Sequence, residues 1–484
     1  MDIAVEISQN RFLAVTERQL HAALKITARA RPRAGEPAAS GHPPGLAEVI
    51  VIDCSGSMGN PPTKMAAARR ATAAAIEALP DGVGFAILEG THEARLVYPS
   101  TPPLASATAK TRKEATDAVA GLAAAGGTAI GSWLGRASTL VAARPSAIGH
   151  VLLLTDGRNE HESPEELESV LATCKGRFVC DARGIGDGWE PRELMRIAEV
   201  LQGTADAVRR PAELTADFLD TMRAAMAKTV PEVRIRVSTM PWARVAFVKQ
   251  VHPTITELVE HRVEVDERTV EFLTRSWGDE SRDYHMCLEL DPTDLPLFED
   301  VRVARIDVLA AGELRAGPAT ALVHRTDDPV AHTRVDPEVA HYTGQEEVSR
   351  VLVAGCDAHK AGDLIAAHAH WANAVQMATK ANNVAALERL AYLVEIIDAG
   401  EGQVRLREDL PDIALNLGQV HSTHTTAFPG HPQDGEVPAK PPRAGEGGGS
   451  HCGRVYRPGD SHCEVCGAEL GSAGSDGPAG GDGE

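Results

Sequence analysis

Oxygen-bearing side chains follow the apolar run Val49–Ile52 at every second position: Asp53, Ser55 and Ser57. In an extended segment such residues point to the same side, so one carboxylate and two hydroxyls can face a common small space. This set suits a hard divalent cation, Mg²⁺ above all, which takes few protein oxygens and keeps several waters. The spacing therefore indicates a partly open metal site that a carboxylate from another molecule could complete.

The segment resembles the Asp-x-Ser-x-Ser part of the metal-ion-dependent adhesion site of von Willebrand factor A domains. The resemblance implies two further ligands, a threonine in a glycine-rich loop and an aspartate after another buried strand. Thr128 follows two glycines and Asp156 follows an apolar run, so both positions are filled. It thus implies a site for Mg²⁺, or Mn²⁺, formed by Asp53, Ser55, Ser57, Thr128 and Asp156. The first motif alone would also fit a turn that caps a helix, but the two partner loops favour the metal site.

The metal-site residues lie in a region, residues 46–228, where predicted strands and helices alternate. Such alternation is typical of a mostly parallel, doubly wound sheet, here with six strands and about six helices, and the whole region resembles the von Willebrand A fold. Ligands of such sheets bind beyond the carboxyl ends of the strands, so we expect Asp53, Thr128 and Asp156 to converge there. The predicted helices cover Thr63–Leu79, Lys110–Leu122, Ala129–Ala143, a segment starting at Ser163, Arg192–Leu201 and Leu214–Ala227.

Sequence on both sides of this α/β domain has the two-residue period of β-strands. Residues 1–45 contain two alternating runs, Ile3–Ile7 and Leu20–Ile26, and residues 229–342 contain several more. Because two strands alone are not stable, we predict that the first two complete an antiparallel sandwich formed by residues 229–342. The α/β domain would then be inserted into the sandwich, an arrangement that integrins resemble in architecture only.

The remaining chain divides by composition. Residues 343–418 have the apolar spacing of a helical hairpin, with a break near residues 380–383. Residues 419–450 are rich in proline, glycine and polar residues, which predicts a flexible linker, and His421, His424 and His431 are interpreted as linker residues and not as metal ligands. We predict a zinc-ribbon-like module in residues 451–470 and a disordered tail in residues 471–484.

The zinc prediction concerns Cys452, Cys463 and Cys466. The last two stand in Cys-x-x-Cys-Gly, which resembles half of a small zinc ribbon. A second half is incomplete, because Gly449 stands where the other knuckle should begin. His451 or His462 would have to supply the fourth Zn²⁺ ligand, and a ribbon that no longer holds zinc is the alternative.

Charge and hydropathy restrict the partners. The chain of 484 residues has 48 Lys and Arg against 68 Asp and Glu, a formal net charge of -20, which argues against nucleic acid as a partner. It contains no apolar run long enough to span a membrane, and its first ten residues do not have the pattern of a signal peptide. We therefore expect a cytoplasmic protein with reduced cysteines.

The signatures of common enzymes are missing. The sequence has no phosphate-binding loop, and Ser55 and Ser57 do not stand in a Gly-x-Ser-x-Gly motif. A nucleophilic Cys54 would need a positive environment, which Asp53 opposes. We therefore expect a binding protein and not an enzyme.

Our prediction is a cytoplasmic scaffold or regulator whose metal site captures an Asp or Glu of a protein partner. The resemblance to bacterial von Willebrand A proteins implies AAA+ ATPases or phospho-signalling proteins as partners. The alternative is a non-catalytic subunit of an AAA+ ATPase or of a metal-chelatase-like complex, which co-purification of an ATPase would distinguish. A secreted adhesin, the third interpretation, is disfavoured by the missing signal pattern.

Overall fold

Strand β4 (Leu46–Asp53) lies inside a seven-stranded sheet and ends at the first predicted metal ligand. The computed structural model describes residues 1–29, 45–101, 103–293, 295–430, 450–451 and 454–455, and divides into units of residues 1–428 and 429–484. The sheet belongs to the first unit and has the order β10-β9-β8-β4-β5-β6, with β7 pairing to β5. Its other strands are β5 (Gly84–Gly90), β6 (Ala94–Tyr98), β7 (Ala105–Ser106), β8 (Ile148–Thr155), β9 (Val179–Ile185) and β10 (Ala205–Val208).

Five of these strands, β10, β9, β8, β4 and β5, run parallel, and β6 and β7 run antiparallel to β5. The α/β domain is therefore the mixed, mostly parallel sheet that the alternating pattern predicts. Parallel strands share one carboxyl edge, so Asp53 at the end of β4 and Asp156 after β8 must lie at the same edge. This edge positions the candidate site.

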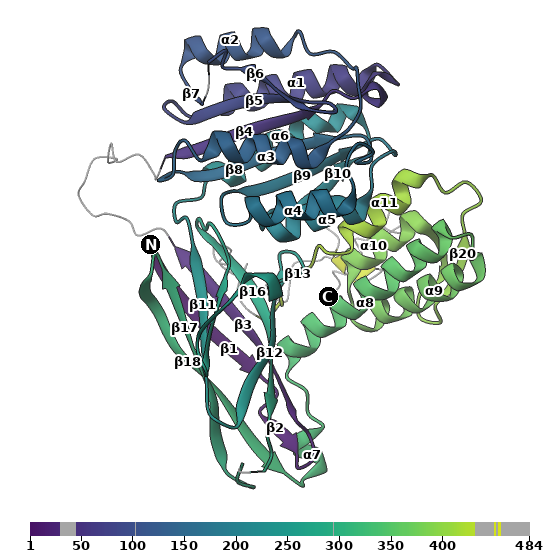
Figure 1. The fold of residues 1–484 in the computed structure, drawn as a ribbon. Coiled ribbons are helices and arrows are strands. Elements are labelled where there is room, and N and C mark those ends of the chain that lie inside the picture. The colour runs from purple at the N-terminus through teal and green to yellow at the C-terminus, as the bar shows by residue number, and fades with distance from the viewer. Residues whose placement is uncertain (30–44, 102, 294, 431–449, 452–453, 456–484) are drawn as a thin grey trace, which may run out of the picture. The chain divides into compact units, whose positions relative to one another are not determined.

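Six helices cover the two faces of the sheet (Figure 1). Alternating residues of β4 bury against different helices: Val49 and Val51 face the side of α3 to α5, and Ile50 and Ile52 face the side of α1, α2 and α6. Burial on both faces explains why the strand sequence is continuously apolar. The helices are α1 (Thr63–Ala78), α2 (Ala109–Val119), α3 (Ile130–Val141), α4 (Pro164–Cys174), α5 (Pro191–Leu201) and α6 (Leu214–Met226).

A two-sheet β-sandwich precedes and follows this domain in the sequence. One sheet has the order β1-β3-β16-β12-β13 and the other β14-β15-β11-β17-β18-β2. The N-terminal β3 pairs with β16 from Ala28 opposite Glu280 to Gln19 opposite Glu289, so the chain leaves the sandwich after β3 and returns at β11. Figure 1 shows the purple strands β1 and β3 beside teal strands of the later sequence. The strands are β1 (Asp2–Gln9), β2 (Phe12–Ala14), β3 (Gln19–Arg29), β11 (Val233–Thr239), β12 (Ala243–His252), β13 (Thr256–Glu257), β14 (Arg262–Asp266), β15 (Thr269–Leu273), β16 (Glu280–Leu290), β17 (Asp300–Ala310) and β18 (Glu313–Thr326).

The helical region is more divided than a simple hairpin. After the short α7 (Pro329–His332) it contains α8 (Pro337–Lys360), α9 (Leu364–Lys380), α10 (Val384–Leu393), the strands β19 (Val394–Asp398) and β20 (Gln403–Leu406), and α11 (Asp412–His421). The expected break after Lys380 is present, and a further break follows Lys360, where Gly362 has a φ of 81°. Trp371 is fully buried in the helical core, as its apolar spacing indicates.

The prediction of a flexible linker from residue 419 is wrong for the part that the structure describes. α11 continues to His421, and the following segment is bound by backbone hydrogen bonds from Ile255 N to Thr423 O (2.7 Å) and from Thr425 N to Pro253 O (3.0 Å). Backbone groups paired in this way, together with the packing of Phe428 against a buried cluster, fix residues that composition alone marks as polar and irregular.

The rest of the tail largely lies outside the described residues, and so do His431, Cys452, His462, Cys463 and Cys466. The described backbone of His451 belongs to β21 (Ser450–His451), which pairs with β22 (Arg454–Val455) in the second unit. None of the helices in the described ranges has both the length and the apolar sequence needed to cross a bilayer.

Candidate metal-binding site

Asp53 ends β4 and is fully buried. Its Oδ1 accepts a hydrogen bond from the backbone N–H of Ser55 (2.7 Å). Its Oδ2 accepts from the Thr155 hydroxyl (2.6 Å) and from the backbone N–H of Asp156 (3.3 Å). These bonds connect the ends of β4 and β8, so the carboxylate is held in one orientation before any ligand binds.

The two serines and Asp156 form a chain of oxygens beside it. Ser55 Oγ lies 2.9 Å from Ser57 Oγ, and the Ser57 hydroxyl donates to Asp156 Oδ1 (2.7 Å). Ser55 and Asp156 are buried, whereas Ser57 is exposed. The Ser57 end of this row of hydrogen-bonded oxygens is therefore accessible from solvent, as the sequence pattern predicts for a partly open site.

Thr128 completes the set. A Cβ added to Gly157 would lie 3.3 Å from Thr128 Oγ1 and 3.6 Å from Ser57 Oγ, so both hydroxyls border the space above this glycine. A side chain at residue 157 would press on these oxygens, and glycine leaves the space open. The structure thus brings all five predicted residues together at the carboxyl edge of the sheet.

Sequence reasoning missed a cation at the site. Lys64, on the first turn of α1, donates from Nζ to Asp156 Oδ2 (2.8 Å), and only 10% of its side chain is exposed. Its aliphatic part is confined by Gly186, where an added Cβ would lie 2.8 Å from Lys64 Cε. The sequence did contain a signal, because Lys64 stands among mostly small and apolar residues at the start of this helix. A lysine there must either extend to the metal site or be exposed to solvent.

Residues that follow Asp156 also hold the Thr128 loop, and they too were missed. The backbone N–H of Thr128 donates to His161 Nδ1 (3.2 Å), and Gly127 has no room for a Cβ, which would lie 1.9 Å from the His161 ring. Glu162 accepts the N–H groups of Gly131 and Ser132, both at 2.7 Å, at the start of α3. The second and third ligand loops therefore form one unit.

The donor set fits a hard divalent cation. Two carboxylates and three hydroxyls are oxygen ligands of the kind that Mg²⁺ prefers, and burial raises the pKa of Asp53 against the hydrogen bonds from Ser55 and Thr155. A buried carboxylate whose charge is not neutralised by a neighbouring cation favours the binding of a metal ion. The described residues contain no cluster of three or more His, Cys, Asp or Glu side chains placed to hold a metal, so the fit depends on the hydroxyls.

Cys54 has no nucleophilic character in this setting. Its thiol is fully buried, and burial together with the negative charges of Glu89 and Asp53 raises its pKa to about 12. The thiol stays protonated at neutral pH, which agrees with packing behind the metal-site loop.

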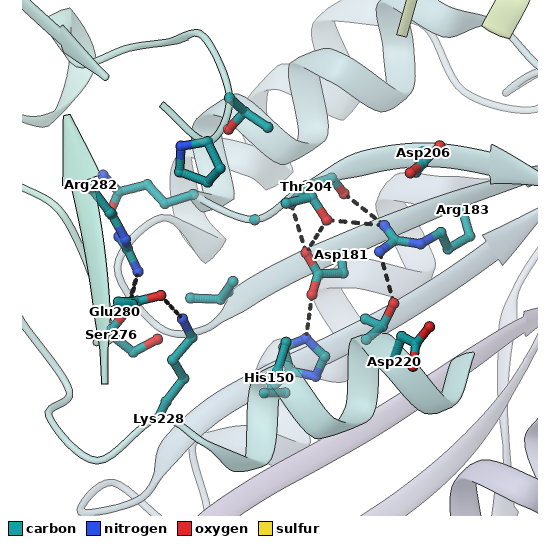
Figure 2. A pocket seen from close by; sticks show the side chains of 18 of the residues that line it. His150, Asp181, Arg183, Thr204, Asp206, Asp220, Lys228, Ser276, Glu280 and Arg282 are labelled. Carbon is teal, nitrogen blue, oxygen red and sulfur yellow. Dashed lines mark hydrogen bonds and ion pairs between the residues drawn. The ribbon is translucent and has the colours of Figure 1, made fainter. Parts of the chain in front are cut away.

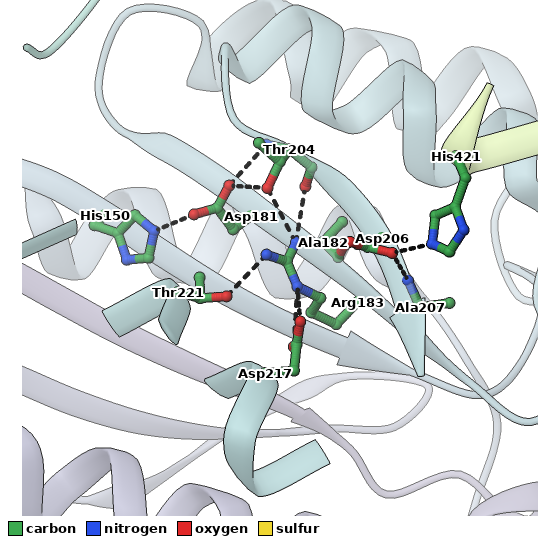
Figure 3. Close-up of polar contacts among 10 residues, drawn as sticks. All are labelled: His150, Asp181, Ala182, Arg183, Thr204, Asp206, Ala207, Asp217, Thr221 and His421. Carbon is green, nitrogen blue, oxygen red and sulfur yellow. Dashed lines mark hydrogen bonds and ion pairs between the residues drawn. The ribbon is translucent and has the colours of Figure 1, made fainter. Parts of the chain in front are cut away.

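A second polar cluster lies on the same strands but near their amino ends (Figure 3). His150 of β8 is hydrogen-bonded through Nδ1 to Glu48 Oε2 (2.7 Å) and through Nε2 to Asp181 Oδ2 (3.0 Å). Burial opposes the charged imidazole, but the two carboxylates dominate and raise the pKa of His150 to about 10. His150 therefore carries a positive charge and, against the effect of burial, holds the pKa of Asp181 below its usual range, whereas burial raises the pKa of Glu48.

Arg183 extends this cluster towards α6. Its guanidinium is paired with Asp217 (3.0 Å) and donates to the hydroxyls of Thr221 (2.8 Å) and Thr204 (3.1 Å). Figure 2 shows the adjoining cavity, of about 560 Å³, in which Glu280 accepts from both Lys228 (2.7 Å) and Arg282 (2.8 Å). The charges around this cavity are neutralised by one another, which is the pattern of a structural network and not of a metal site.

Comparisons with known proteins agree with the fold. Residues 47–207 match the von Willebrand factor type A domain. Among solved structures the chain is similar to "von Willebrand factor type A from Catenulispora acidiphila", with 38% identity, a TM-score of 0.81, and coverage of 88% of this chain and 97% of that one. The ArnB paralog VWA2 from Sulfolobus acidocaldarius shares the fold at 12% identity and a TM-score of 0.51, with coverage of 87% and 98%. An uncharacterized protein of Synechocystis sp. is 24% identical over 217 residues, 44% of this chain and 50% of that protein, so the match spans half the length of that curated relative.

Proposed function

Because the chain belongs to the von Willebrand factor type A family, we propose that it is a binding protein whose divalent-cation site captures an acidic side chain of a protein partner. The observation that carries this proposal is the convergence of Ser55, Ser57, Thr128 and Asp156 oxygens at one accessible edge of the sheet, next to the buried Asp53. The magnesium ion that we assign to this site would accept a carboxylate oxygen of the partner in its outward position.

The chain's own residues prepare the site for this role. Asp53 is fixed by three hydrogen bonds from the ends of β4 and β8, so little reorganisation is needed on binding. With two carboxylates and three hydroxyls as protein ligands, a divalent cation would keep a position held by water, which a partner's carboxylate oxygen could take. The amine of Lys64 occupies Asp156 Oδ2 and must be accommodated or displaced when a cation enters.

The identity of the ion, a cytoplasmic location and a scaffold or regulatory role stay predictions. So does the absence of enzyme activity. Zinc binding by Cys452, Cys463 and Cys466 also stays a prediction, because these residues lie outside the described part of the chain.

A calorimetric titration tests the metal site directly. We expect MgCl₂ or MnCl₂ to bind the wild-type protein with one site, and Asp53→Ala to abolish binding. A matched control is Asp220→Ala, which removes an exposed carboxylate from α6 and should bind as the wild type does. Equal binding by Asp53→Ala would place the cation elsewhere and reject the proposed site.

Partner capture tests the function. We expect a protein from the native extract to be retained in Mg²⁺, released in EDTA and not retained by Asp53→Ala, with the folded state of the variant checked by circular dichroism. The same proteins retained under all three conditions would contradict capture through the metal. If the retained protein is an ATPase, the chain is a subunit of an ATPase complex, which is the alternative role.

A further inference from the structure

A groove of about 1060 Å³ lies between the helical region and the end of β10. It is bordered by α10, by the segment before α11 and by Arg209, which directly follows β10. Contacts of α11 with the α/β domain fix these walls: Asn416 Nδ2 donates to the carbonyls of Asp187 and Trp189, both at 3.2 Å, and His421 Nε2 lies 2.7 Å from Asp206 Oδ1. The groove is therefore a feature of the folded first unit.

Three arginines border the groove, and none of them forms an ion pair with a carboxylate of the described residues. Arg407 donates only to the Ala391 carbonyl (2.8 Å), and the Arg209 guanidinium lies 3.5 Å from the centroid of the Tyr392 ring, a cation–π contact. Arg389 is half-buried and has no hydrogen bond or ion pair within the described chain, and burial lowers its pKa. We name this feature the arginine groove.

Some other arginines of the first unit do have carboxylate partners. Neighbouring Arg210 pairs with Glu213, Arg192 with Asp357 and Arg405 with Glu395. Two acidic residues do border the groove, Glu388 and Asp409, but both are exposed and neither forms an ion pair with the three arginines. A cation held half-buried without a partner is costly, and a bound anion would remove that cost.

The start of α11 also borders the groove, through Pro411, Ile413 and Ala414. The Ala414 N–H donates to the Pro411 carbonyl (2.9 Å), and Asp412 already places a carboxylate in the first turn, so the groove's attraction for anions depends on the arginines and not on this helix end. Leu410, Ile413 and Leu417 add an apolar wall.

We propose that the arginine groove binds a phosphorylated peptide segment of a protein partner. Guanidinium groups bind phosphate through paired hydrogen bonds, and a phosphoryl group carries nearly two negative charges, enough to compensate several unpaired arginines. The groove is much larger than a phosphate ion, and its apolar wall can pack against the side chains that flank the modified residue. This site is separate from the metal ligands and does not depend on the proposed metal-mediated capture.

Fluorescence anisotropy on the full chain tests this proposal with three labelled peptides of the same sequence, carrying phosphoserine, serine or glutamate between leucines. We expect the phosphopeptide alone to bind, Arg389→Gln and Arg209→Gln each to weaken it by about tenfold or more, and added salt to weaken it further. Arg223→Gln is the control, because it removes the same charge from an exposed arginine on α6.

The outcomes separate this site from the metal site. Binding that persists in EDTA and in Asp53→Ala supports the arginine groove. Binding lost in EDTA assigns the peptide to the metal site and overturns the proposal. Equal binding of the glutamate peptide overturns the preference for phosphate, and binding unchanged in both Arg389→Gln and Arg209→Gln, or no binding of the phosphopeptide, overturns the site.

Discussion

The two ends of β4 and β8 carry two polar clusters, each with two carboxylates and one cation, that differ in how the cation is shared and in access to solvent. Near the amino ends, the buried His150 contacts both Glu48 (2.7 Å) and Asp181 (3.0 Å). At the carboxyl ends, Lys64 pairs with Asp156 alone, and the partners of Asp53 are neutral hydroxyl and amide groups. The exposed Ser57 opens this second cluster to solvent, whereas His150 and Glu48 are buried. A carboxylate without a cationic partner at an accessible edge therefore distinguishes the proposed binding end, and a cation shared by two carboxylates distinguishes the structural one.

The largest expected effect is a loss of stability when His150 is replaced at the structural end. We expect His150→Gln to lower the free energy of unfolding by roughly 3–5 kcal/mol at pH 7, because Glu48 and Asp181 lose their buried counter-charge. Urea denaturation measures it. His261→Gln is a matched control: His261 is also buried, but burial lowers its pKa to about 4, so a neutral ring is replaced and the loss should be about 1 kcal/mol. Equal losses would show that the charge of His150 is not what stabilises the cluster.

The pH dependence of stability should change at the same residue. The folded-state pKa of His150, about 10, lies above its unfolded value of 6.5, so its contribution is complete below pH 6.5 and is lost as the pH rises towards 10. The wild type should therefore lose roughly 2–4 kcal/mol more than His150→Gln between pH 7 and pH 10. Denaturation curves of both proteins at four pH values measure this difference, and parallel pH profiles would contradict a protonated His150.

The two clusters also differ in how well the sequence predicts them. The metal-site residues follow their strands directly, so a sheet with a shared carboxyl edge brings them together whatever the detailed packing. His150, Glu48 and Asp181 stand inside apolar strands at positions that pair only through the strand order β4-β8-β9 and through its register. Neither the order nor the register can be read from local sequence. Lys64 was missed for the same reason, because its partner is distant in sequence.

The same limit of prediction from local sequence applies to the sandwich and to the helical region. The period of two predicts the strands, and the pairing of β3 with β16 follows from the need to bury an otherwise isolated hairpin. The ordered conformation of residues 422–428 could not be predicted from their polar composition, because it depends on backbone hydrogen bonds to residues 253–255 of a different domain.

At the binding end, a substitution should remove metal binding with little change in stability. Asp53→Asn removes a charge whose burial is unfavourable, as its raised pKa indicates: a folded pKa above the unfolded one means that the ionised form costs stability at neutral pH. It also replaces one accepting oxygen by an amide donor, so at least one of the hydrogen bonds from Ser55, Thr155 and Asp156 is lost. Because these two effects oppose each other, we expect the unfolding free energy in EDTA to change by less than about 1 kcal/mol and the Mg²⁺ affinity to fall by about two orders of magnitude. Calorimetry and urea denaturation in EDTA measure both quantities. A loss of stability in EDTA as large as that of His150→Gln would mean that Asp53 contributes to the fold in the way that His150 does.

The smallest effect concerns the one cation at the binding end. Lys64→Met keeps the length of the side chain but removes the positive charge from Asp156, so an entering cation no longer meets repulsion or competition at Oδ2. We expect Mg²⁺ to bind about 5–10-fold more tightly by calorimetry, whereas Lys113→Met, which removes an exposed pair with Asp117, should leave the affinity unchanged. If Lys64→Met instead weakens Mg²⁺ binding, the amine orients Asp156 for the metal and does not compete with it. In that case Lys64 is part of the metal site, and the contrast between this site and the His150 cluster is one of degree.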